Sequence, residues 1–201
     1  MKHLTITVRE DMMSLFYPLL QMGFQLNIRV GCSIHSLLCD QLGVAPDYLR
    51  ERVKTIFLNQ KPVDNVQNAL IKDGATLALS AAMPGLVGAT FRCDGVLAAF
   101  RSTITHQNES AATGPGDGTI TLKLFNMLIS EMGPLLLEQG ITVNWTDLQP
   151  VLVEALQGQD PLAISLTLDG RSIDLTQLMA TEQMDFPMLI FMKVHTLVQQ
   201  G

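Results

Sequence analysis

The chain has 201 residues, a formal net charge of −6, and 47% hydrophobic against 16% charged residues. This apolar content excludes a disordered chain, and the acidic balance without any lysine or arginine cluster argues against nucleic acid and anionic lipid as partners. The longest apolar runs fall short of the ~20 residues that a membrane-spanning helix needs, so we expect no membrane span.

The first half of the chain predicts strands that alternate with helices. Alternating apolar residues favour a strand, whereas a polar cap, an apolar stripe and a closing glycine favour a helix. Four or five short strands with a single central helix predict a mixed sheet that curls over that helix. In chain order we expect a strand at 4–8, a helix at 12–23, a strand at 24–30, a helix at 34–43, a turn at 44–53, and short strands around the turns at 59–61 and 73–74.

The second half predicts antiparallel hairpins and two helices. Asp-Gly pairs between alternating runs favour tight hairpin turns, and Thr146 with Gln149 forms a capping-box pattern. The last apolar run fits a buried strand or a helix, and we prefer the strand. No repeat of roughly 20 to 50 residues is evident. In chain order we expect a hairpin at 89–105, a mobile loop tip at 106–118, a strand at 120–125, a helix at 125–140 interrupted near Gly133-Pro134, a helix at 146–158, a hairpin at 162–175 and a strand at 187–198.

The residues up to position 85 resemble the β-grasp, ubiquitin-like sulfur carriers, such as the small subunit of molybdopterin synthase and the thiamine-pathway carrier. The resemblance depends on Asn59, on Leu70 with Lys72-Asp73-Gly74, and on the apolar strand that leads to Pro84-Gly85. It implies a β-grasp domain over 1–85, in which a mixed sheet covers a helix. The remaining residues, 86–201, then form a second small α+β domain with antiparallel hairpins.

The carrier family uses a free C-terminal Gly-Gly tail, which threads into a partner's active site and carries a thiocarboxylate. The matching segment here reads Met83-Pro84-Gly85-Leu86, so only one glycine is present and its carboxyl group lies in a peptide bond. The resemblance therefore implies the fold without the acyl chemistry. Two alternatives restore a reactive end: cleavage of the chain after Gly85, or use of the terminal Gly201.

Few side chains have the spacing of a catalytic or metal site. Cys32, His35 and Cys39 could supply soft ligands from one helical face, but buried thiols are more often core residues. His106 near Glu109 fits a solvated loop, and His195 fits a hydrogen-bonded core position.

The GPGDG stretch at 114–118 precedes a strand instead of a helix, so we interpret it as a flexible hairpin tip and not as a phosphate loop. Three cysteines, with Cys93 the third, fit reduced thiols and no disulfide framework.

These patterns predict a cytoplasmic α+β protein without catalytic residues, metal or cofactor. We expect a binding module for a protein or a small ligand, and a homodimer. The expected binding residues are Met83, Pro84 and Gly85 at the domain junction and the pair Arg92 and Arg101, which could bind an anion or form the surface salt bridges that are usual in a hairpin. The alternative function is an accessory component or processed carrier in sulfur transfer, molybdopterin or thiamine biosynthesis. A third alternative is an enzyme whose site is assembled from residues far apart in the sequence.

Overall fold

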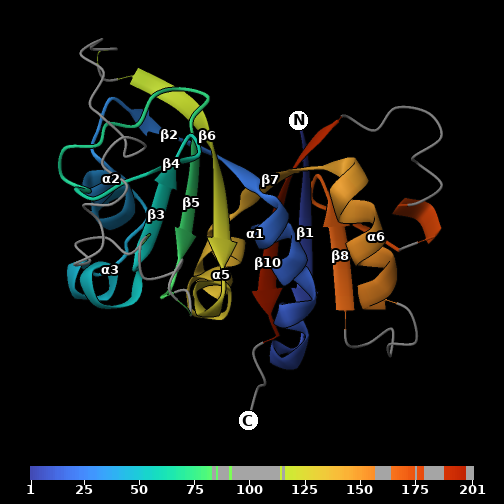
Figure 1. The fold of residues 1–201 in the computed structure, drawn as a ribbon. Helices are drawn as coiled ribbons and strands as arrows, with labels where there is room; N and C mark the ends of the chain where they lie inside the picture. The colour runs from blue at the N-terminus through green and yellow to red at the C-terminus, as the bar shows by residue number, and fades with distance from the viewer. Residues whose placement is uncertain are drawn as a thin grey trace. The chain divides into compact units, whose positions relative to one another are not determined.

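A computed structural model describes residues 1–82, 85, 91, 114, 116–156, 164–174, 176–178 and 188–197 as a mixed α+β protein. Its elements are labelled in Figure 1. In chain order they are β1 (Lys2–Val8), the 3-10 helix η1 (Glu10–Phe16), α1 (Tyr17–Met22), β2 (Phe24–Val30), α2 (Ile34–Ser36), the π-helical turn η2 (Leu37–Gln41), α3 (Pro46–Arg52), β3 (Thr55–Leu58), β4 (Lys61–Pro62), β5 (Thr76–Ser80), β6 (Gly116–Phe125), α5 (Met127–Gln139), β7 (Ile141–Asn144), α6 (Trp145–Leu156), β8 (Ile164–Leu168), β9 (Arg171–Ile173) and β10 (Leu189–Thr196).

The chain divides into two compact units, which differ from the expected domains 1–85 and 86–201. Unit 1 combines Met1–Phe24 with Ser130–Gly201, and unit 2 spans Gln25–Ile129. The difference arises at β1, which we expected to belong to an N-terminal sheet. Instead, β1 pairs in parallel with β10 and antiparallel with β8, so its hydrogen-bond partners come from the far end of the chain.

Unit 1 is a five-stranded mixed sheet with helices packed on one face. Its strand order is β7-β10-β1-β8-β9. The register places Leu4 beside Met192 and Ile6 between Val194 and Leu166, and all of these side chains are buried. The helix α6 packs against η1 and α1 (Figure 1). Alternation along β1 therefore buries Leu4, Ile6 and Val8 in the core of this unit.

Unit 2 has strand order β4-β3-β5-β6-β2. The central strands β5 and β6 are parallel, with Leu77 beside Leu122. At the start of this pair the carboxylate of Asp73 accepts a hydrogen bond from the Thr119 N–H at 2.7 Å, and the Gly74 N–H donates to the Thr119 carbonyl at 2.8 Å. Buried side chains of β2, β3, β5 and β6 share one core with the helices, including Ile28, Ile56, Leu79, Leu124, Ile34, Leu38 and Leu49.

Two hairpin turns reveal an internal structural repeat. Asn59, at a φ of 50°, donates its N–H to the Thr76 carbonyl and accepts the Thr76 N–H on its side chain, both at 2.8 Å. Asp169, also at a φ of 50°, makes the same pair of bonds with His3, at 2.8 and 2.9 Å. The sequences agree, because LNQKPVDNVQ at 58–67 corresponds to LDGRSIDLTQ at 168–177. The period of this repeat exceeds the range of roughly 20 to 50 residues in which the sequence shows no repeat.

The two helix ends that precede β2 and β7 match as well. Gly23 and Gly140 have φ values of 117° and 107°, and each donates its N–H to the carbonyl four residues earlier, at 3.1 and 3.0 Å. The matched segments therefore run from β2 to β4 in unit 2 and from β7 to β9 in unit 1. The strand beside the matched hairpin is β5 in unit 2 but β1 in unit 1, so unit 2 takes this strand from the chain after the hairpin and unit 1 takes it from the N-terminal residues.

Most of the elements predicted for the described residues are present, with three corrections. The hairpin predicted at 89–105 lies outside the described residues except for Phe91. Residues 46–52 form α3 instead of a turn, with Pro46 at the first helical position and Leu49 buried. Residues 116–118 of the GPGDG stretch begin β6 and are not part of a loop tip. The helix at 127–139 continues through Pro134, so the interruption predicted near Gly133-Pro134 is wrong. The final apolar run is the strand β10, as expected. Within the described residues, no helix is long and apolar enough to cross a membrane.

Candidate functional site

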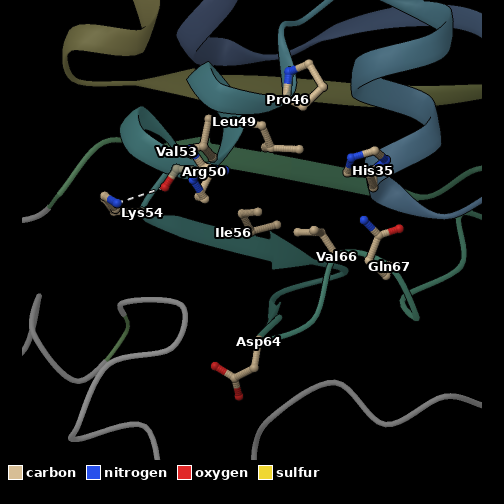
Figure 2. A pocket seen from close by; sticks show the side chains of 10 residues that line it. All are labelled: His35, Pro46, Leu49, Arg50, Val53, Lys54, Ile56, Asp64, Val66 and Gln67. Atoms are coloured by element: carbon tan, nitrogen blue, oxygen red, sulfur yellow. Dashed lines mark hydrogen bonds between the residues drawn. The ribbon is translucent and has the colours of Figure 1, made fainter.

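A pocket of about 580 Å³ opens in unit 2 between α3, β3 and the segment that follows β4. Pockets of roughly 300 to 1,000 Å³ are typical of small-molecule sites. Figure 2 shows the lining side chains, with Leu49, Ile56 and Val66 in the middle. The full lining consists of His35, Pro46, Leu49, Arg50, Val53, Lys54, Ile56, Asp64, Val66 and Gln67.

The apolar floor of the pocket is held by the fold of unit 2. Leu49 and Val53 lie four residues apart on α3 and just beyond it, so they project from the same side of the helix, and both are buried. Ile56 belongs to β3 and is buried too. Val66 is held by backbone bonds, because the His35 N–H donates to its carbonyl at 3.0 Å. The floor is therefore built from regular elements that tertiary packing fixes.

The rim of the pocket is polar. In Figure 2, Arg50 and Lys54 lie at one end and His35 and Gln67 at the other. The Lys54 Nζ donates to the Arg50 carbonyl at 2.8 Å. The Arg50 guanidinium is an exposed group that forms ion pairs with Asp47 at 2.9 Å and Glu51 at 3.5 Å. Such exposed pairs contribute little stability, but they hold the guanidinium at the surface.

Gln67 differs from its counterpart in the other repeat. In unit 1, the side chains of Asp174 and Gln177 each accept the other's backbone N–H, at 2.6 and 3.1 Å, as a reciprocal cap. In unit 2 the capping oxygen belongs to Asn65, which accepts the N–H groups of Gln67 and Asn68 at 2.8 and 3.2 Å. The Gln67 side chain is exposed at the rim of the pocket and has no capping role there.

The Cys32, His35 and Cys39 group does not form an activated thiol site. Cys39 Sγ lies 3.7 Å from the His35 Nε2, but burial and the neighbouring Asp40 raise the pKa of the Cys39 thiol above its ordinary value. Burial also raises the pKa of Cys32, whose Sγ donates to the Arg29 carbonyl at 3.2 Å. Both thiols are therefore protonated at neutral pH, which is unfavourable for nucleophilic attack. No group of three or more possible metal ligands occurs in the described part of the chain.

Four of the five predicted binding residues, Met83, Pro84, Arg92 and Arg101, lie outside the described residues, as do Cys93, His106 and Glu109. The fifth, Gly85, is exposed and has a φ of 82°. His195 is half-buried on β10, on the opposite side of the strand from the buried Val194. The motif residues Asn59 and Asp73 of the carrier resemblance bond to the backbone of Thr76 and Thr119, respectively.

The pocket residues on α3 do not follow from the sequence prediction, which places a turn at 44–53. A signal for the helix was present: Pro46 and Asp47 suit a first turn, Arg50 and Arg52 suit a last turn, and Leu49 is apolar between them. The contribution of 64–67 depends on tertiary packing and has no sequence signal of its own.

Comparisons of the chain with family models, curated proteins and solved structures find no match.

Proposed function

We propose that this protein is a non-catalytic binding module and that the unit 2 pocket receives the apolar part of a small ligand. The pocket volume of about 580 Å³ over an apolar floor is the observation that carries the proposal. Its polar groups lie at the rim, where they can orient a ligand without a cost for burying unpaired polar atoms. Ligand binding therefore depends on the shape of the pocket and on the burial of the ligand's apolar surface.

A β-grasp assignment for unit 2 belongs to the same proposal. The resemblance implies a mixed sheet over a helix, and unit 2 packs α2, η2 and α3 on such a sheet. The parallel pair β5 and β6 and the turn residues Asn59 and Asp73 support the assignment. The strand that lies beside β5 comes from residues 116–125, so the proposed domain includes residues well beyond position 85.

The processed-carrier alternative requires a folded domain that ends at Gly85. Cleavage there would separate β5 from β6 in sequence, although the two strands are hydrogen-bonded neighbours from Thr76 to Ser80. It would also separate β1 from β8 and β10. The topology favours a module that functions as a whole chain over a carrier released at this position.

Replacing Val66 with tryptophan is expected to block the pocket. At a net gain of roughly 0.3 kcal/mol per non-hydrogen atom, the about 12 such atoms of 2-naphthylmethanol give about 3.6 kcal/mol, which places its Kd at a few millimolar. Val66→Trp fills the space beside Ile56 and should weaken binding by about tenfold or more. Fluorescence titration of the naphthyl probe with the full-length protein measures this effect.

The matched control is Val153→Trp, which places the same side chain at a half-buried position of α6 in unit 1. It should leave the affinity for the probe unchanged. Equal affinity of the wild type and Val66→Trp for 2-naphthylmethanol would contradict the proposed site, as would failure of the wild type to bind the probe.

A further inference from the structure

We propose that the ligand of the unit 2 pocket carries an anionic group that Lys54 binds, while its apolar body lies on Leu49, Ile56 and Val66. This inference rests on the proposed function, because it names the class of ligand for the same pocket. The ligand class is an amphiphilic organic acid, in which a carboxylate or a similar anion is attached to an apolar skeleton.

The ammonium group of Lys54 is held at the edge of the pocket. Its Nζ donates to the Arg50 carbonyl at 2.8 Å, close to the residue at which α3 ends, Arg52. A cation is favoured at a helix C-terminus, because the last carbonyl groups carry partial negative charge. This bond restricts a flexible side chain and thereby lowers the entropy cost of binding an anion there.

The ammonium group of Lys54 can also donate hydrogen bonds to a ligand. An ammonium group has three donors, and one of them is used by the Arg50 carbonyl. The ion pairs found among the described residues involve Arg9 and Arg50, and none involves Lys54. Arg50 differs, since Asp47 and Glu51 already neutralise it. Lys54 is therefore the lining cation that an incoming carboxylate can reach without displacing an existing ion pair.

The remaining lining residues define the rest of the ligand. One carboxylate, Asp64, lines the pocket, against the two cations Arg50 and Lys54. In Figure 2, Asp64 lies apart from the end of the pocket that Lys54 and Arg50 occupy. The apolar side chains Leu49, Ile56 and Val66 lie between Lys54 and the polar end formed by His35 and Gln67. A ligand with its anion at the Lys54 end thus places its apolar skeleton over the floor.

The test compares two probes of the same shape, 2-naphthoate and neutral 2-naphthylmethanol, in titrations of the full-length protein at pH 7. We expect the wild type to bind the acid about tenfold more tightly, because a charge-assisted hydrogen bond is roughly twice as strong as a neutral one and acts here at a partly exposed group. Lys54→Met should remove this preference, so that the acid binds no more tightly than the alcohol. Lys54→Arg should keep the preference.

The control variant is Lys61→Met, which removes an exposed lysine of β4 that does not line the pocket. It should bind both probes as the wild type does. Equal affinity of the wild type for acid and alcohol, or a preference that survives in Lys54→Met, would overturn the inference while the pocket itself stands. If neither probe binds the wild type, both the inference and the proposed function fail.

Discussion

A chain that ends after Gly85 is expected to lose cooperative folding altogether. In the full-length protein, β1 pairs with β10 from Lys2 to Val8 and with β8 from Leu4 to Val8, and both partners are absent from the shortened chain. The strand β5 likewise loses β6. Because domains are stable by only about 5 to 15 kcal/mol, the loss of these strands and of the apolar surface they bury exceeds the available margin.

Thermal melting followed by circular dichroism, together with the amide spectrum of residues 1–85, measures this effect. As a control, a protease site placed after Gly85 in the full-length protein allows the folded chain to be cut in place. The two fragments should then co-elute, because the pairs β1 with β10 and β5 with β6 hold them together. A dispersed spectrum and a sigmoidal melt for residues 1–85 would favour the processed carrier.

Replacing Gly140 with alanine is expected to cost about 3 kcal/mol of unfolding free energy. Gly140 lies between α5 and β7 at a φ of 107°, a conformation that costs an L residue roughly 1 to 3 kcal/mol. A Cβ atom there would also overlap the ring of Phe191 and approach the Lys193 Cε at 3.1 Å. Overpacking of this kind adds about 1 to 3 kcal/mol to the loss. Movement of the flexible Lys193 side chain reduces this cost.

Gly170→Ala isolates the contribution of the backbone. Gly170 has a φ of 79°, but an added Cβ would meet no atom within 4 Å. We expect this variant to lose about 1 kcal/mol, the lower end of the backbone cost. Urea unfolding of both variants measures the difference. Equal losses for Gly140→Ala and Gly170→Ala would show that the packing against Phe191 contributes nothing.

Local patterns in the sequence predicted most elements, because each depends on residues close together in the chain. The alternation of Leu4, Ile6 and Val8 predicted a strand with one buried face. It did not identify the strands that pair with β1, because any strand with a matching apolar face could lie beside it. The pairing of β1 with β8 and β10 therefore appears only in the structure.

The candidate site was predictable to a lesser degree. Its floor combines Leu49 and Ile56 with Val66, which are brought together by the packing of α3 on β3 and by the bond from His35 to the Val66 carbonyl. No spacing in the sequence encodes such a group. Gln67 illustrates the limit, because its counterpart Gln177 also follows an aspartate by three residues but serves as a cap.

The most direct test of the binding module is the amide spectrum of the full-length ¹⁵N-labelled protein during titration with 2-naphthylmethanol. We predict that the largest shifts cluster at the pocket, at residues such as His35, Leu49, Ile56 and Gln67. An unchanged spectrum, or shifts that cluster on the strands of unit 1, would contradict the proposal that the unit 2 pocket is the binding site.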